Sequence, residues 1–378
     1  MGMIINQAQP PFANPVQFYL AQVIAVTGTG TAAQITVSSP ISGQNLTISN
    51  TKQATPQVGD TVAIVGTGIS TDIVVGISRL ASVSGYLYAC DGSNLYQISL
   101  TTFTVTNTLP LAGAYSVTVD HNGMFAYVTN GQGGSLGGQK TIYQVNPASL
   151  TVNQTVPVTP SQSGGGVVDP SNSYLYVTSS SGLMKFALPS MTLVSTLSTV
   201  VGNGTGALAI DPLGQYLYTY NASTTQIVKV ALSTFTQVGA VSGGNYAYTI
   251  DPSGAYLYSI YSPTQTLYQT NLSTFTNAGS VGSISQTSQM AIDQNGYLYV
   301  PVTSGAGGMR FTLPTISSHS SFSGYDSSGE WVFLVDSAGT FGYMLGASGT
   351  ITKILLSGPT DVTSLKVSSS GLTSGYIF

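Results

Sequence analysis

The chain has 378 residues, which is long enough for two or more domains, and only 5% of them are charged, against roughly 25% in an ordinary soluble domain. Eight Lys and Arg against twelve Asp and Glu give a net charge of −4. No basic cluster could hold a phosphate backbone, and no window approaches the ~20 apolar residues of a membrane span. The sequence therefore predicts no nucleic-acid partner and no membrane span.

The low charge also bears on the response to acid. Few carboxylates are protonated as the pH falls, so we expect acid to destabilise the fold only slightly. A neutral composition rich in Ser, Thr and Gly is equally typical of exposed β-rich proteins, and both interpretations stay open. Cys90 is the only cysteine, so no disulfide forms within the chain, and we interpret this residue as small, buried and apolar.

The first 78 residues lack the repeat that fills the rest of the chain. After a Pro-rich entry, runs such as VQFYLAQVIAV and QNLTISN predict about five short strands and a small β-barrel. The amino terminus has no charged start or continuous apolar stretch, so it does not read as a signal peptide. The phrase VGDTVAIV…DIVVGI, within Val58 to Ile77, resembles the OB-like barrels at the bases of phage spike and baseplate proteins. The resemblance implies a domain, residues 1–78, that docks on other virion proteins.

Residues 79–378 are dominated by a repeat in which an Asp turn leads into alternating apolar residues. The six full copies are VDHNGMFAYVTN (119–130), VDPSNSYLYVTS (168–179), IDPLGQYLYTYN (210–221), IDPSGAYLYSIY (250–261), IDQNGYLYVPVT (292–303) and YDSSGEWVFLVD (325–336). Degenerate copies start at Ser82 (SVSGYLYACD) and at Val367 (VSSSGLTSGYIF). The mean interval between all eight copies is about 41 residues, which suits a four-stranded propeller blade. The apolar residues alternate with a period of two, which predicts strands rather than helical repeats.

A second signature follows the first by about twenty residues, as in SLTTFTV (99–105), ALSTFTQ (231–237) and NLSTFTN (271–277). One unit therefore runs from the strand Tyr246–Ile250 through the Asp-Pro turn to the strands AYLYSIY, TLYQTNL and TNAGSV. Six units and one composite blade, made from the strands after Ser82 and from TSLKV (Thr363 to Val367), predict a ring without exposed edges. The expected fold is all-β, a seven-bladed β-propeller preceded by a small OB-like β-barrel. The final GYIF is expected either to add a further strand to the composite blade or to pack beneath it. Eight blades with an open seam are the alternative to seven.

The stretch VDHNGMFAYVTN resembles the YVTN family of β-propeller repeats, since it contains Tyr127, Val128, Thr129 and Asn130 in the order that names the family. The stretch VDPSNSYLYVTS nearly repeats this pattern. The resemblance covers roughly residues 80–378 and implies a propeller. It also implies a surface protein or virion component, because the family is known mainly for such proteins and shares no chemistry.

The repeated aspartates are predicted to be structural turn residues: Asp120, Asp169, Asp211, Asp251, Asp293 and Asp326. In DPSG and DPLG, Asp stands first, Pro second and Gly fourth, which is the residue preference of a type I turn whose carboxylate caps backbone N–H groups. The functional alternative is a rim of Ca²⁺ sites. It is less favoured because the carboxylates lie one blade apart, without the dense ligand spacing of a calcium loop.

Residues suited to catalysis or metal binding are scarce. His121 and His319 are the only histidines, Glu330 is the only glutamate, and there is no GxSxG elbow. A glycosidase pair of carboxylates would have to come from the aspartates, most of which belong to the repeat. The sequence therefore predicts no metal, no cofactor and no enzyme, with a propeller lyase or glycosidase as the alternative.

Loops are the predicted contact regions, because the repeat does not specify them. The Gly-rich stretch NGQGGSLGGQK is the candidate partner loop, through Asn130, Gly131, Gln132 and Lys140. Five N-x-S/T sequons are candidate glycosylation sites: Asn45, Asn153, Asn203, Asn221 and Asn271. The tyrosines of the YLY motifs are predicted to pack between neighbouring blades, with aromatic platforms for carbohydrate as the alternative.

These features together predict a structural protein of a virion, such as a spike, turret or tail component, from a virus of a hot, acidic archaeal habitat. The expected location is the virion surface or another extracellular site. The barrel would anchor several copies in an assembly, and the propeller loops would contact a host surface protein or glycan. An archaeal or bacterial cell-surface adhesin or envelope-layer protein is the alternative.

Overall fold

A computed structural model of the protein describes residues 85–378 except 131–140, 159–162, 201–206, 285–286, 288, 303–306 and 324–328, and it describes five strands before residue 85. The chain divides into two compact units, Met1–Ser82 and Val83–Phe378. Outside the strands, the described residues contain only one helical element, the 3-10 turn η2 (Ser262–Thr264). No helix in this part of the chain is long and apolar enough to cross a membrane. The prediction of an all-β protein is confirmed.

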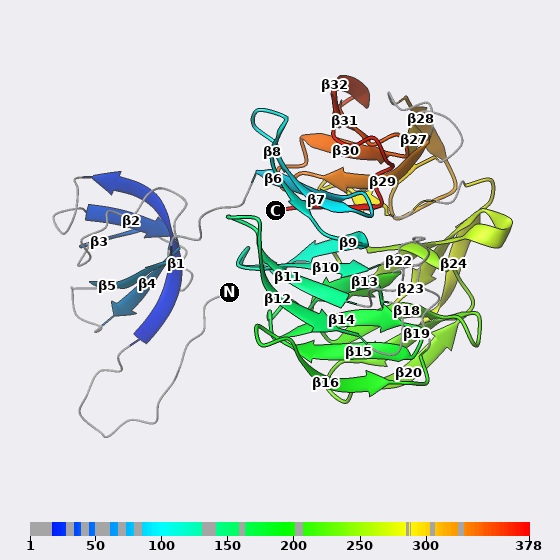
Figure 1. The fold of residues 1–378 in the computed structure, drawn as a ribbon, viewed down its shortest axis with the longest axis horizontal. Helices are drawn as coiled ribbons and strands as arrows, with labels where there is room; N and C mark the ends of the chain where they lie inside the picture. Colours follow the sequence, from blue (N-terminus) through cyan, green and yellow to red (C-terminus); the bar gives the residue numbers. More distant parts are fainter. Residues whose placement is uncertain are drawn as a thin grey trace. The chain divides into compact units, whose positions relative to one another are not determined.

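The first unit contains five short strands, drawn in blue in Figure 1. They are β1 (Gln17–Thr27), β2 (Gln34–Ser38), β3 (Asn45–Ser49), β4 (Thr61–Gly66) and β5 (Ile73–Ser78). The strands close in the order β1-β2-β3-β5-β4, because β1 pairs with both β2 and β4. The likeness of this barrel to OB domains and its docking role stay predictions.

The second unit is a seven-bladed β-propeller, as predicted, in which each blade is a four-stranded antiparallel sheet (Figure 1). Blade I contains β33 (Ser374–Ile377), β6 (Tyr86–Cys90), β7 (Asn94–Ser99) and β8 (Thr104–Pro110). Blade II contains β9 (Ala114–Val119), β10 (Ala126–Asn130), β11 (Thr141–Asn146) and β12 (Thr151–Pro157). Blade III contains β13 (Ser163–Val168), β14 (Tyr174–Ser179), β15 (Gly182–Ala187) and β16 (Thr192–Leu197).

The remaining blades follow the same order of strands. Blade IV contains β17 (Leu208–Ile210), β18 (Tyr216–Asn221), β19 (Gln226–Ala231) and β20 (Thr236–Val241). Blade V contains β21 (Tyr246–Ile250), β22 (Tyr256–Tyr261), β23 (Thr266–Asn271) and β24 (Thr276–Val281). Blade VI contains β25 (Ala291–Ile292), β26 (Tyr297–Pro301), β27 (Gly308–Thr312) and β28 (His319–Phe322). Blade VII contains β29 (Glu330–Val335), β30 (Phe341–Gly346), β31 (Thr350–Leu355) and β32 (Thr360–Lys366).

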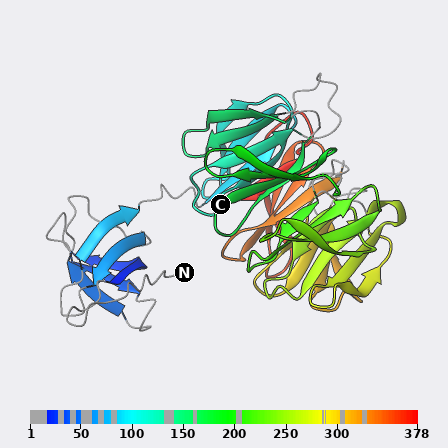
Figure 2. The same cartoon turned by 90° about the horizontal axis from the view of Figure 1, so that it is seen from below.

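Within a blade, burial follows the position of the strand. The second strands are buried on both faces, as the near-continuous apolar run YLYSIY of β22 requires. The fourth strands, such as β16 and β20, are mostly exposed. The first strands contact one another in ring order and surround the axis. In Figures 1 and 2 the blades accordingly run in colour from cyan to red, and the last blade meets the first.

The ring closes through the end of the chain. Strand β33 pairs antiparallel with β6, with Tyr376 opposite Tyr88, and the N–H of Gly85 donates to the carbonyl of Phe378 at 2.7 Å. TSLKV was wrong as the first strand of the composite blade, because residues 363–366 lie in β32, the fourth strand of blade VII. The final GYIF does add a strand to the composite blade, because residues 375–377 lie in β33. Both segments alternate apolar and polar residues, and only SGYI reaches the free edge of β6.

The Asp turn of blade VII also differs from the prediction. Asp326 lies outside the described residues, and the turn between the first and second strands is formed by Asp336, whose carbonyl accepts from the N–H of Gly339 at 2.9 Å. The predicted second strand, EWVFLV, is the first strand, β29. With Asp336 in place of Asp326, the last interval between turn aspartates follows the spacing of the preceding blades.

Candidate functional site

The turn aspartates hold the start of each second strand. In blade V the N–H of Gly254 donates to the carbonyl of Asp251 at 2.9 Å, and the N–H groups of Ala255 and Tyr256 donate to the Asp251 carboxylate at 2.8 and 3.2 Å. Equivalent carboxylate bonds occur in the other continuous blades at Asp120, Asp169, Asp211, Asp293 and Asp336. These six turn carboxylates therefore accept backbone hydrogen bonds within their own turns.

The part of the chain that the structure describes has no cluster of side chains suited to metal binding. It contains no group of three or more His, Cys, Asp and Glu placed to hold an ion. His121 is exposed in the turn of blade II, and His319 is exposed in β28, with its ring 5.2 Å from that of Phe311. Cys90 is fully buried, and burial raises the pKa of its thiol.

Each blade buries one tyrosine in its second strand, and these side chains are 0% or 1% exposed: Tyr88, Tyr127, Tyr176, Tyr218, Tyr258, Tyr299 and Tyr343. Burial raises the pKa of Tyr88 to about 12 and raises the other six still further. These phenols therefore stay protonated at neutral pH and belong to the packing between blades.

The residue directly opposite this tyrosine, in the third strand, is polar in every blade. It is Gln97, Gln144 or Gln269 in blades I, II and V, and Lys185, Lys229, Arg310 or Lys353 in blades III, IV, VI and VII. Half of the eight Lys and Arg of the chain thus occupy one repeat position. In all blades but VI, the register with the fourth strand shifts just after this residue, and such a bulge re-aims a side chain.

In blades I, II and V the glutamine joins its blade to the next one. The amide nitrogens of Gln97, Gln144 and Gln269 donate to backbone carbonyls in the following blade, those of Pro147, Pro189 and Pro314, at 2.9, 2.8 and 2.6 Å. These carbonyls lie in the turn between the third and fourth strands, here called the outer turn. We call these the glutamine interfaces.

In blades III, IV and VII a lysine takes this place. The ammonium groups lie 3.9 to 4.0 Å above the first aromatic ring of the second strand, in the pairs Lys185–Tyr174, Lys229–Tyr216 and Lys353–Phe341. Each also lies within 6 Å of a Phe in the next outer turn, in the pairs Lys185–Phe235, Lys229–Phe275 and Lys353–Phe103. These Phe rings pack 5.9 to 6.1 Å from the buried tyrosines Tyr176, Tyr218 and Tyr343. We call these the lysine interfaces.

The identity of the third-strand residue matches the sequence of the next outer turn. Glutamine faces a turn that contains Pro, in NPASL, LPSM and LPTI, whereas lysine faces LSTF or LTTF. Blade VI is the exception, because Arg310 lies 4.7 Å above Tyr297, and the ring of Tyr299 stacks on Phe333 at 4.8 Å. Sequence reasoning missed this match, although an alignment of the repeats displays it.

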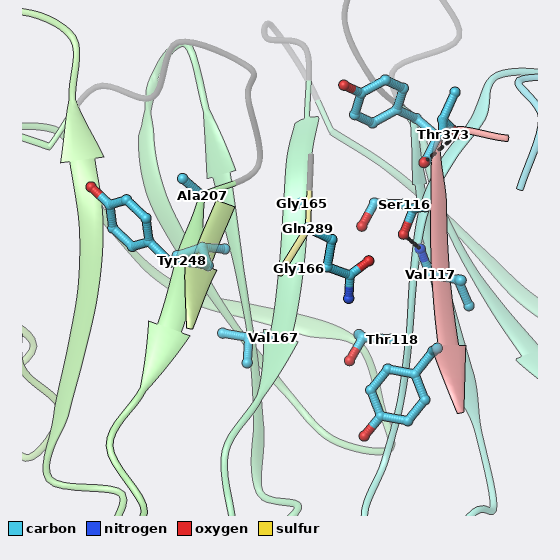
Figure 3. A pocket seen from close by; sticks show the side chains of 14 residues that line it. Ser116, Val117, Thr118, Gly165, Gly166, Val167, Ala207, Tyr248, Gln289 and Thr373 are labelled. Carbon is cyan, nitrogen blue, oxygen red and sulfur yellow. Dashed lines mark hydrogen bonds between the residues drawn. The ribbon is translucent and has the colours of Figure 1, made fainter. Parts of the chain in front are cut away.

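A cavity of about 180 Å³ lies among the first strands of the ring (Figure 3). Hydroxyl and amide groups line it, from Ser116, Thr118, Gln289, Thr373 and Ser374, together with the rings of Tyr115, Tyr248 and Tyr376. None of its lining residues is charged. Figure 3 shows the Gln289 side chain among these groups and labels Gly165 and Gly166, which lie in β13.

Hydrogen bonds and burial fix the groups around this cavity. The Thr373 hydroxyl donates to the Tyr115 carbonyl at 2.7 Å, and the Tyr248 hydroxyl donates to the Gly244 carbonyl at 2.8 Å. Burial raises the pKa of Tyr115, Tyr248 and Tyr376, and the Asp120 charge adds to the shift at Tyr376. The cavity is therefore uncharged and presents hydrogen-bonding groups and aromatic faces.

The asparagines of the candidate loop and of the sequons differ in burial and in hydrogen bonding. Asn130 is 6% exposed, and its amide nitrogen donates to the Ala112 carbonyl at 3.2 Å; Gly131, Gln132 and Lys140 lie outside the described residues. Asn221 is 1% exposed and its amide nitrogen donates to the Thr199 carbonyl at 2.8 Å. Burial and this bond disfavour glycosylation at Asn221, which stays a prediction.

The other four sequons stay predictions. Asn153 is exposed on β12, although its amide nitrogen donates to Gln144. Asn271 is half-buried, and its side-chain oxygen accepts from the N–H groups of Ser273 and Thr274, both at 3.0 Å. Asn45 begins β3, where side chains lie outside the described residues, as does the whole of Asn203.

No family model matches the chain, and no curated protein matches it. The likeness to YVTN repeats and to virion proteins is therefore not confirmed. A functionally unknown protein from Desulfotomaculum acetoxidans has a similar structure, with a TM-score of 0.64 and 13% identity over 78% of this chain and 99% of that one. A hydrazine synthase structure from Kuenenia stuttgartiensis is similar with a TM-score of 0.57 and 13% identity over 69% of this chain and 88% of that one.

The hydrazine synthase corrects one prediction. We expected a chain that is not an enzyme because the sequence has few residues suited to catalysis, but a similar propeller belongs to an enzyme. The prediction that the chain is not an enzyme is therefore wrong, because a propeller of this kind also occurs in an enzyme. At 13% identity the likeness shows the fold alone and assigns no reaction to this chain.

Proposed function

We propose that this chain is a structural attachment protein displayed on the outside of a virus particle, where its propeller binds neutral glycan on a host surface. The observation that carries the proposal is the uncharged cavity of the ring, lined by hydroxyl, amide and tyrosine groups. Such a lining suits a ligand rich in hydroxyl groups, which needs hydrogen-bond partners and aromatic faces but no counter-ion.

Two further features support this role. The chain has 5% charged residues, so its exposed surface is dominated by neutral polar groups. The barrel of the first unit is a separate compact unit, which suits a division into a docking domain, held by other virion proteins, and a binding domain present in several copies.

A glycan array with the full chain tests the proposed binding. Gly165→Leu adds a side chain at a position that lines the cavity, where it is expected to take up ligand space. We expect this variant to lose at least tenfold in affinity for the glycan that the wild type retains, about 1.4 kcal/mol. Gly282→Leu is the matched control, because Gly282 is exposed and a Cβ there meets no atom within 4 Å.

Equal retention of wild type and Gly165→Leu on every glycan would contradict the cavity as the binding site. Display is tested separately, by gold-labelled antibody on particles and on cells of the natural source. Labelling confined to the cell envelope would replace the virion role by that of a surface adhesin.

A further inference from the structure

Two grooves of the same composition open between blades, at the interfaces of blade III with IV and of blade VII with I. Their volumes are about 560 and 270 Å³. One blade contributes the turn aspartate, both aromatic residues and the lysine, and the next blade contributes its outer turn. In the III–IV groove these residues are Asp169, Tyr174, Tyr176, Lys185, Leu232 and Ser233. In the VII–I groove they are Asp336, Phe341, Tyr343, Lys353, Leu100 and Thr101.

The lysines of these two grooves differ from the third lysine at the same repeat position. Lys229 donates a hydrogen bond to the Leu272 carbonyl of the next blade at 3.2 Å. Within the described part of the chain, Lys185 and Lys353 have their aromatic contacts but no hydrogen-bond acceptor. The N–H groups of these two ammonium groups are therefore not used by a protein acceptor in this part of the chain, and donors remain for a ligand in the groove.

The charges restrict the chemistry of the ligand. A carboxylate in each groove disfavours an anion, and an ammonium disfavours a cation. A hydroxyl group suits both, because it accepts from the ammonium and donates to the carboxylate, and such charge-assisted bonds are the stronger ones. The aromatic residues at positions 174, 216 and 341 add apolar faces. A neutral ring that carries several hydroxyls and one apolar face combines these features.

We propose that the III–IV and VII–I grooves are two equivalent binding sites for a neutral pyranose, distinct from the cavity at the ring axis. Both lie at the rim that carries the Asp turns, three interfaces apart in one direction and four in the other. One propeller therefore presents two sites toward the same surface, which raises avidity without tighter single contacts. The inference does not depend on the glycan role of the axial cavity.

Exposed residues of the outer turns allow a direct test with the full chain. Ser233→Trp and Thr101→Trp each place a ring at the mouth of one groove without changing an interface lysine, since both residues are exposed. Ser273→Trp is the matched control, because Ser273 is the equivalent exposed residue at the interface where Lys229 is already bonded. Retention on surfaces coated with glucose, galactose or mannose pyranosides is measured, with the soluble methyl pyranosides as competitors.

We expect each single groove variant to lower retention about tenfold or more through lost bivalency, the double variant to abolish it, and Ser273→Trp to match the wild type. Lys185→Met with Lys353→Met repeats the test by removing the donor, and the melting temperature of each variant reports its folding. Wild-type retention by the folded double variant, an equal loss in Ser273→Trp, or retention only of charged sugars would overturn the proposal. Loss in Gly165→Leu alone would assign the binding to the axial cavity instead.

Discussion

Blades I, II and V meet the next blade through a buried glutamine, whereas blades III, IV and VII meet it through a lysine above an aromatic ring. The tyrosine opposite is the same in both sets and is fully buried. The glutamine amide donates to a carbonyl of the next blade and so links the two blades directly. At two of the three lysine interfaces, those of blade III with IV and of blade VII with I, a groove lies beside the lysine. The two grooves thus lie at interfaces where the third-strand residue is a lysine that does not donate to the next blade.

The largest expected loss of stability comes from removing the buried tyrosine, and it should occur at both kinds of interface. Tyr258→Ala at a glutamine interface and Tyr218→Ala at a lysine interface should each lower the free energy of unfolding by about 3–5 kcal/mol, because each empties a buried aromatic site. Chemical denaturation measures both. A loss below about 1 kcal/mol in either variant would show that the tyrosine is not a common packing element.

The third-strand residues should separate the two sets. Gln269→Leu leaves the Pro314 carbonyl without its donor and should cost about 1–3 kcal/mol. Lys229→Met loses a more exposed bond and a cation–π contact, and should cost about 0.5–1.5 kcal/mol. Denaturation midpoints of the two variants measure these losses in stability. A larger loss for Lys229→Met than for Gln269→Leu would contradict the view that the glutamine is the stronger link between blades.

The smallest expected effect concerns the alkaline range. Burial lowers the pKa of Lys185 and Lys229 below the ordinary 10.5, although Asp169 and Asp211 partly oppose the shift. The unfolded chain then binds more protons than the folded one below 10.5, so these lysines make stability rise with pH in that window. Lys185→Met with Lys229→Met should therefore make the slope of stability against pH less positive between about pH 8 and about 10, while Gln269→Leu should keep the wild-type slope, including the opposing contribution of the buried tyrosines. Equal slopes in all three proteins would contradict this origin.

The sequence predicts the fold well because the repeat is local. The Asp turn, the alternating YLY strand and the S-T turn each appear in consecutive residues, so the seven blades follow from the pattern. The errors arose where two local segments compete for one role. Both YDSSG and VDSAG suit the turn of blade VII, and both are followed by aromatic residues five and seven positions after the aspartate. The local sequence therefore does not separate them, and in the structure Phe341 and Tyr343 of the second segment take the places of the aromatic pair in the second strand.

The candidate sites were less predictable because they form between blades. The Lys185 groove joins Asp169 to Ser233 of the next blade, residues far apart in sequence whose relation follows only from ring packing. The axial cavity likewise gathers residues from separate first strands. The match becomes visible when the third-strand residue of one repeat is compared with the outer turn of the next repeat, since Lys then goes with an S-T-F or T-T-F turn and Gln with a turn that contains Pro.

The central claim, that the third-strand residue and the next outer turn act as a matched pair, is tested most directly by a double-mutant cycle between Lys229→Met and Phe275→Leu. The account predicts a coupling of about 0.5–1 kcal/mol in the free energy of unfolding, because the ammonium lies 5.7 Å from that ring. The cycle of Lys229→Met with Phe103→Leu, at another interface, should be additive within about 0.3–0.5 kcal/mol. Additivity in both cycles would contradict the claim.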